Sequence, residues 1–234
     1  MLGKPNKSPS KSSLTLGTLA MLALVGFVHF GFLNLHSLWN NEFITLKVLA
    51  MDYREIFVER LHRNHMPFYF VILKAWTSVA GDGEIALHLP SALFSLLGIL
   101  FVWRIGVHMF GKPMGLIVLA LAGLCQVHVE LSNDARMYSW LFCACAGSLW
   151  AYIHYLDSGR RRFLIVLGLC GMMGISLQLI YLFVPVAILL HLCSLGKNSR
   201  PVRWPVIVAV LTPVLLTLPI IIWWTAVQDK IGHA

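Results

Sequence analysis

Residues that can bind an anion and move a proton occur at a few polar points in an otherwise apolar chain. Glu42 follows the first apolar stretch, His65 lies in the next polar segment, and Asp134 and Arg136 lie close together further along the chain. A guanidinium group binds anions through paired hydrogen bonds, and a carboxylate can take the proton of a reacting hydroxyl. These residue types indicate a site that binds an anionic headgroup and activates a hydroxyl, if the fold brings them together.

Each of these residues also has a simpler interpretation. Asn41 and Glu42 are typical of a helix N-terminus, where an amide caps the first turn and an acid interacts favourably with the helix dipole. From the local sequence alone, this cap is the favoured interpretation. His65 fits a turn between two helices equally well, and Asp134 and Arg136 fit the boundary charges of a membrane protein.

Composition indicates that the solvent of most of the chain is lipid. The 234 residues are 58% hydrophobic and 12% charged, and the mean hydropathy of +0.77 lies above that of soluble domains. A water-soluble core is therefore excluded. The five cysteines lie in apolar stretches without metal-ligand spacing, which favours a packing role.

Apolar stretches of about 20 residues, the length that crosses a bilayer, predict seven transmembrane helices. They cover residues 14–36, 88–110, 113–131, 137–157, 163 to about 177, about 178 to 195, and 205–224. The stretch 163–195 is divided near Gly174, Ser176 and Gln178, because a single helix of that length would be about 50 Å long. Glu130 lies inside the third stretch, and an acid at that depth indicates a functional residue.

The remaining segments define the domain organisation. We expect a disordered cytoplasmic tail at 1–13, one all-helical transmembrane module at 14–225 and a short outer tail at 226–234. Within residues 37–87, segments 42–63 and 68–80 are too polar or too short to cross the membrane. They predict amphipathic helices that lie in the outer membrane interface.

The distribution of charge predicts the sidedness of this module. Connectors assigned to the cytoplasm contain eleven Lys and Arg residues and one acid, Asp157, whereas the outer segments contain seven basic and nine acidic residues. This is the asymmetry of the positive-inside rule. It predicts a multi-pass protein of a bacterial-type inner (plasma) membrane with a cytoplasmic N-terminus, and it explains the net charge of +8 without nucleic-acid binding.

Four segments, taken in order, form a recognisable pattern. They are SLWNNEFITL at 37–46, NHMPFYFVILKAW at 64–76, EIALHLPSALFSLLGILFVWRIGVHMFGKPMG at 84–115 and SNDARMYS at 132–139. The pattern resembles that of the bacterial polyprenyl-phosphate-sugar glycosyltransferases of the GT-C superfamily, such as protein O-mannosyltransferases and aminoarabinose transferases. Their first outer loop carries an Asp-Glu pair, and later segments contain a His-Pro-Pro-Leu-Tyr motif and an Ala-Arg-Met-Tyr loop.

The resemblance implies an inverting transfer of a sugar from a polyprenyl-phosphate carrier to an acceptor outside the cytoplasm. Glu42 and Asp134 are then the expected catalytic carboxylates, and Arg136 is suited to stabilise the departing lipid phosphate. The expected substrate-binding residues are Asn41, His65, Tyr69, Lys74, Glu130, Arg136, Tyr138 and Gln178. No metal ligands are expected, and the need for a divalent cation such as Mg²⁺ or Mn²⁺ is left open.

The chain departs from this pattern at Asn41, where the family usually has Asp. An amide cannot act as a general base, so Glu42 or Asp134 must serve, or catalysis is absent. Relatives also usually continue beyond the seventh span. The alternative hypothesis is therefore a catalytically silent subunit that binds the lipid carrier and has a partner subunit supplying the C-terminal half. A small transporter is less favoured, because the polar residues cluster at one face.

Overall fold

The computed structural model describes residues 11–31, 33, 40–63, 65–195 and 200–231, and every regular element in this part of the chain is a helix. In order, the elements are α1 (Lys11–Phe30), α2 (Asn40–Leu49), α3 (Tyr53–His62), α4 (Phe68–Ala80), α5 (Glu84–Phe110), α6 (Lys112–Gly123), α7 (Gln126–Ser132), α8 (Tyr138–Ser158), α9 (Arg161–Leu177), the 3-10 turn η1 (Leu179–Leu182), α10 (Phe183–Ser194) and α11 (Arg200–Ile231). The predicted all-helical class is confirmed.

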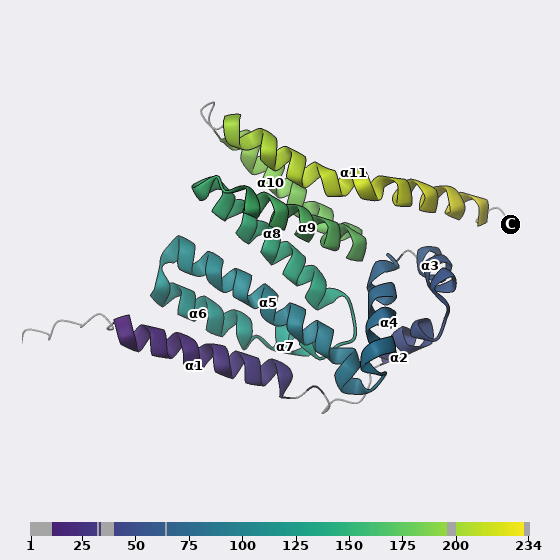
Figure 1. Ribbon diagram of the computed structural model, residues 1–234, viewed down its shortest axis with the longest axis horizontal. Helices are drawn as coiled ribbons and strands as arrows, with labels where there is room; N and C mark the ends of the chain where they lie inside the picture. The colour runs from purple at the N-terminus through teal and green to yellow at the C-terminus, as the bar shows by residue number, and fades with distance from the viewer. Residues whose placement is uncertain (1–10, 32, 34–39, 64, 196–199, 232–234) are drawn as a thin grey trace, which may run out of the picture.

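The long helices pack side by side, and the three short helices α2, α3 and α4 gather at one end of them (Figure 1). α5 contacts both α6 and α8, α8 contacts α9, and α9 contacts α11, while α1 packs on α6. The α7–α8 turn reaches the same end as α2 and α4. Segments that are far apart in the sequence therefore meet at this end of the bundle.

A tight turn at Gly111 brings α5 and α6 together. Gly111 has a φ of 83°, a left-handed conformation that favours glycine, and Pro113 follows in the first turn of α6, where proline is well tolerated. A Cβ atom at Gly115 would lie 2.2 Å from a methyl carbon of Val107. Small residues allow such close helix packing in membranes. The break predicted between the second and third spans is thus confirmed.

Length and apolar composition identify some of these helices as membrane spans. Among the described residues, α5 and residues 203–220 of α11 are each long and apolar enough to cross a membrane. If the bent pair α6–α7 counts as one span, the number of candidate spans is three. Shorter apolar helices cover Leu14–Phe30, Phe68–Ala80 and Leu179–Ser194. The chain is a polytopic all-helical membrane protein, and the count of seven spans stays a prediction.

The third predicted span is not one straight helix. α6 and α7 meet at an angle of 57°, because the backbone at Cys125 is extended and ends the helical path. The bend leaves the Gly123 carbonyl without its usual helical partner, and the Nε2 atom of the buried His29 lies 3.0 Å from that oxygen. The side chain of His29 therefore compensates for the break.

Other boundaries also differ from those predicted. α5 begins at Glu84, one turn before the predicted start of the second span, and α11 continues to Ile231 through most of the predicted outer tail at 226–234. Apolar runs do not mark these ends, because polar residues can extend a helix beyond the hydrocarbon. The predicted tail up to residue 10, and the predicted end of the first span at 34–36, lie outside the described residues.

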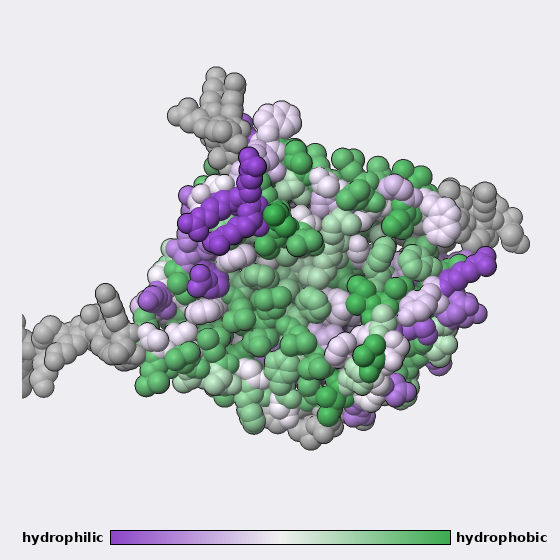
Figure 2. Space-filling view, in the orientation of Figure 1, coloured by the Kyte–Doolittle hydropathy of each residue, from purple (hydrophilic) through white to green (hydrophobic). Residues whose placement is uncertain are grey.

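A broad apolar surface separates hydrophilic patches at opposite edges of the molecule in Figure 2. Large apolar side chains that are more than 60% exposed include Leu16, Leu121, Ile165, Leu169 and Phe183. So large an apolar surface is unfavourable in water and favourable against lipid chains. The surface thus agrees with the composition in assigning lipid as the surrounding solvent.

The seven-span topology predicts that Asp82 and Ser158 lie on opposite sides of the membrane. The α4–α5 turn and the α8–α9 turn, where these exposed residues lie, are at opposite ends of the bundle (Figure 1). Single cysteines at the two positions, after replacement of the exposed Cys125 and Cys193 by serine, can be labelled in intact cells with an impermeant maleimide. We expect only one of them to react before permeabilisation. Reaction of both would refute the span count.

Candidate functional site

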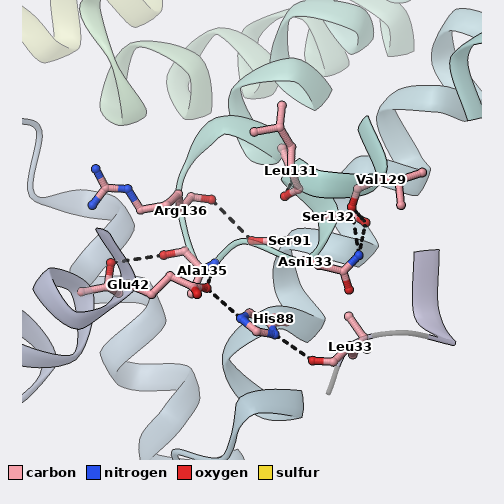
Figure 3. Close-up of polar contacts among 12 residues, drawn as sticks. Leu33, Glu42, His88, Ser91, Val129, Leu131, Ser132, Asn133, Ala135 and Arg136 are labelled. Atoms are coloured by element: carbon pink, nitrogen blue, oxygen red, sulfur yellow. Dashed lines mark hydrogen bonds and ion pairs between the residues drawn. The ribbon is translucent and has the colours of Figure 1, made fainter. Parts of the chain in front are cut away.

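Glu42 lies at the buried centre of the candidate site. It is in the first turn of α2 and exposes only 2% of its surface. Its Oε1 atom lies 2.7 Å from Nε2 of His88 on α5 and accepts the N–H of Ala135 in the α7–α8 turn at 2.8 Å (Figure 3). A buried carboxylate without such partners would be strongly destabilising. Glu42 is therefore more than a residue near a helix end, because it joins three separate parts of the chain.

His88 is a site residue that the sequence analysis does not identify. It is 1% exposed and lies little more than one turn into α5. Its Nδ1 atom is 2.8 Å from the carbonyl oxygen of Leu33, and its Nε2 atom contacts Glu42. The only sequence signal is a histidine at the start of a predicted span, on the same predicted side as Glu42. That signal does not indicate that His88 contacts Glu42, because this contact depends on how α2 and α5 pack.

Side chains from two helices fix the α7–α8 turn. Thr45 on α2 donates its hydroxyl to the Ala135 carbonyl at 3.2 Å, and Ser91 on α5 donates to the Arg136 carbonyl at 3.4 Å. The Ala135 N–H is held by the carboxylate of α2 described above. The backbone on both sides of Ala135 is therefore held in place (Figure 3). As a result, the side chains of Asp134 and Arg136 project from an anchored turn.

The pKa of Asp134 is raised to about 6, mainly by burial and then by the negative charge of Glu42. The positive charges of Arg136 and His88 act in the opposite direction. At pH 7 the carboxylate is still mostly ionised, and it is a stronger base than an ordinary aspartate. A general base performs best when its pKa lies near the working pH. Asp134 therefore has the electrostatic character of a general base.

Tyr69 on α4 brings a buried hydroxyl to this region. Its ring packs edge-on against Trp140, with 5.4 Å between the ring centroids, and the residue is 1% exposed. Among the described residues, its hydroxyl makes no hydrogen bond of good geometry, although the Ser91 hydroxyl is close enough to interact with it. Burial raises the pKa of Tyr69 well above its usual value, and the negative charge of Asp134 adds to this effect. Tyr69 is thus a neutral donor close to Asp134, and a buried polar group of this kind favours a ligand that can accept its hydrogen bond.

His65 lies between two arginines. Its backbone N–H donates to the Arg60 carbonyl at 2.8 Å. Burial lowers the pKa of His65, and the positive charges of Arg60 and Arg136 lower it further. The imidazole is therefore neutral at pH 7, and it can both donate and accept a hydrogen bond. His65, Arg60 and Arg136 are close enough to interact electrostatically, and we call their surroundings the cationic region.

Neither Lys74 nor Gln178 is joined to Glu42 or Asp134 by a described contact. The Lys74 ammonium donates to the carbonyl of Leu49, the last residue of α2, at 2.6 Å, which is about 10 Å along the helix from Glu42. Lys74 thus satisfies a carbonyl at a helix end. Gln178 is half-buried between α9 and η1. The break predicted near Gly174, Ser176 and Gln178 is confirmed and lies at Gln178, whereas the contact of Gln178 with a substrate stays a prediction.

Glu130, Tyr138 and Asn41 are not joined to the centre of the site by a described contact. Glu130 is exposed and accepts a hydrogen bond from Gln126 at 2.7 Å. The bend before α7 carries it out of the buried position that a straight third span would give. Tyr138 begins α8 and is 39% exposed. α2 begins at Asn40, so Asn41 is inside the helix, and its side chain lies outside the described part of the structure.

An open cavity of about 920 Å³ lies along α3 rather than around Glu42. It is lined by Met51, Asp52, Arg54, Glu55, Val58, Glu59, His62 and Arg63. The sequence analysis expects the candidate residues to face one site, and the described lining of this cavity does not include them. Among the described residues, no group of three His, Cys, Asp or Glu side chains is arranged to hold a metal ion. Any need for a divalent cation therefore stays open.

Comparison with known proteins identifies one family. The family model described as dolichyl-phosphate-mannose-protein mannosyltransferase matches residues 64–223, more than half of the chain. The match includes His65, His88, Asp134 and Arg136, and it begins after Glu42. No curated protein and no solved structure gives a significant match.

Proposed function

Because the chain belongs to the dolichyl-phosphate-mannose-protein mannosyltransferase family, a family of GT-C membrane glycosyltransferases, we propose that it transfers a sugar from a polyprenyl-phosphate carrier. The acceptor lies on the non-cytoplasmic side of the inner membrane, and the N-terminus is cytoplasmic. The excess of basic residues in the connectors 104–112, 157–162 and 197–203 supports this orientation.

The observation that carries the proposal is the anchored turn with Asp134 and Arg136. A base and an anion-binding cation stand two residues apart on this turn, and the cationic region extends to His65. Sugar transfer from a lipid phosphate requires these two functions. One group must remove a proton from the acceptor, and another must stabilise the phosphate that leaves.

In the proposed reaction, Asp134 takes the proton of the acceptor hydroxyl as its oxygen attacks the anomeric carbon. The bond between that carbon and the phosphate oxygen breaks, and its electron pair leaves with the lipid phosphate. Attack from the opposite side inverts the anomeric configuration. Arg136 donates to the phosphate as its charge increases, and the hydroxyl of Tyr69 and the imidazole of His65 are further donors.

Glu42 has a supporting role in this scheme. Its Oε1 atom already interacts with His88 and with the Ala135 N–H, so removal of Glu42 would release the turn that carries the base. We therefore assign the proton transfer to Asp134 and the support of the turn to Glu42. This assignment does not need an aspartate at position 41, where the chain has Asn41.

Reconstitution of the purified chain in liposomes with labelled polyprenyl-phosphate sugars tests the proposal. We expect release of free polyprenyl phosphate with transfer of the sugar to an added acceptor, and both should depend on the protein. A panel of sugars and acceptors is needed, because neither is specified by the residues of the site. Binding of polyprenyl phosphate without any transfer would support the alternative function instead, a silent carrier-binding subunit with a partner, which Asn41 favours.

A further inference from the structure

The contacts of His88 restrict where its protons can be. The Leu33 carbonyl can only accept a hydrogen bond, so Nδ1 of His88 carries a proton and donates it there. Oε1 of Glu42 accepts the N–H of Ala135 and also lies 2.7 Å from Nε2 of His88. A hydrogen bond between Oε1 and Nε2 then requires one shared proton, carried by either the imidazole or the carboxyl group.

We propose that His88 is a positioning residue: by sharing this proton with Glu42, it keeps Oε1 directed at the Ala135 N–H and so fixes the turn that carries Asp134 and Arg136. Loss of the shared proton leaves the lone pair of Nε2 facing a carboxylate, which is repulsive. Glu42 then turns away, and the Ala135 N–H loses its acceptor. Ser91 contacts the turn from α5 at 3.4 Å and Thr45 contacts it from α2 at 3.2 Å, and both are longer hydrogen bonds than the one from the Ala135 N–H to Glu42.

Charged and titratable groups surround the pair and affect how firmly it holds this proton. Asp134 and Arg136 face the pair from the α7–α8 turn, and Tyr69 faces it from α4. Asp134 ionises with a pKa of about 6. Its negative charge then disfavours loss of the shared proton, because the pair of His88 and Glu42 is neutral with that proton and negative without it. The turn is therefore expected to stay fixed while the pair holds this proton, and to loosen when rising pH removes it.

Two substitutions separate the two contacts of His88. In His88→Gln, the amide nitrogen can reach the position of Nε2 and donate to Glu42, but it carries no proton that titrates. In His88→Asn, the shorter amide can replace only Nδ1, so Glu42 loses the hydrogen bond from position 88 and keeps the one from the Ala135 N–H. The matched control is His29→Asn. His29 is also fully buried, and it contacts the Gly123 carbonyl where α1 packs on α6, away from the α7–α8 turn.

Amide hydrogen exchange of the full-length protein in detergent tests the proposal without any substrate. In peptides that cover residues 133–137, we expect His88→Asn to lower protection at least tenfold at pH 7, whereas His88→Gln and His29→Asn should stay within about threefold of wild type. Protection in the wild type, corrected for intrinsic exchange, should fall between pH 7 and pH 9.5. Protection in His88→Gln should be independent of pH in that range. If His88→Asn does not fold, the pH dependence of protection in wild type and in His88→Gln still tests the proposal. The same pH dependence in both proteins would contradict it.

The effect on turnover rests on the proposed function. A displaced catalytic group costs about 100-fold in rate, so we expect His88→Asn to lower kcat by about that factor with a smaller change in the donor KM. His88→Gln should retain most of the kcat and lose its decline at alkaline pH. Equal protection of residues 133–137 in His88→Asn and wild type would overturn the inference. If the wild type transfers no sugar but the exchange results hold, the proposed function fails and the positioning role stands.

Discussion

Replacement of Asp134 by Asn is expected to lower the rate of sugar transfer by a factor of about 10² to 10⁴, the usual contribution of a general base. The amide has nearly the same shape as the carboxylate, but it cannot accept the proton of the acceptor. Because the pKa of Asp134 is raised to about 6, wild-type kcat should rise with pH through this value. Asp134→Asn should lack that rise, and transfer measured from pH 4.5 to 8 checks both expectations.

The stability of the same variant separates loss of the base from loss of the fold. Folding raises the pKa of Asp134 from 3.8 to about 6. Ionisation of Asp134 therefore destabilises the folded protein relative to the unfolded chain. This destabilisation is fully present above about pH 6 and is lost as the pH falls below 4. We therefore expect Asp134→Asn to have a higher Tm than wild type at pH 8 and a similar Tm at pH 4.

Asp82→Asn is the matched control, because it makes the same chemical change at an exposed turn and should leave transfer unchanged. Transfer by Asp134→Asn within a few-fold of wild type would show that another group is the base. Glu42 would then be the first alternative. In that case Glu42→Gln, which keeps an acceptor for the Ala135 N–H, should abolish transfer.

Replacement of Arg136 by Gln is the second change with a large expected effect, and it acts on binding of the carrier. The loss of one partner from a hydrogen-bonded ion pair costs roughly 2–5 kcal/mol, which corresponds to a loss of affinity for polyprenyl phosphate of at least about 30-fold. Arg136→Lys should lie between wild type and Arg136→Gln, because lysine keeps the charge and loses the planar fork that binds two oxygens.

Titration of the liposome-reconstituted variants with a fluorescent polyprenyl phosphate measures this effect. The control is Arg104→Gln, an exposed arginine of α5 near the opposite end of the bundle, which should bind the carrier as wild type does. A neutral polyprenol serves as the control ligand, since its binding should not depend on Arg136. Equal affinity of wild type and Arg136→Gln for polyprenyl phosphate would place the phosphate elsewhere, with the cationic region around Arg60 as the next candidate.

Local signals in the sequence predicted much of the helical framework. Pro113 and Gly115 marked the break between α5 and α6, and the length of the apolar stretch 163–195 required the break that separates α9 from η1. These features depend on properties of a few neighbouring residues, such as the conformational freedom of glycine and the length of helix that crosses lipid. The bend between α6 and α7 was not predicted, because Gly123, Leu124 and Cys125 lie within an apolar stretch that is long enough to cross the membrane as one helix.

The sequence by itself determined that the chain is a helical membrane protein and which polar segments carry its acids, histidines and arginines. Only the tertiary structure decided which of them meet. Glu42 contacts His88 across 46 residues and Ala135 across 93 residues, whereas Lys74 and Glu130 are held at other positions. The physical reason is that helix formation and membrane burial depend on local composition, while a contact between helices depends on their rotation, tilt and separation.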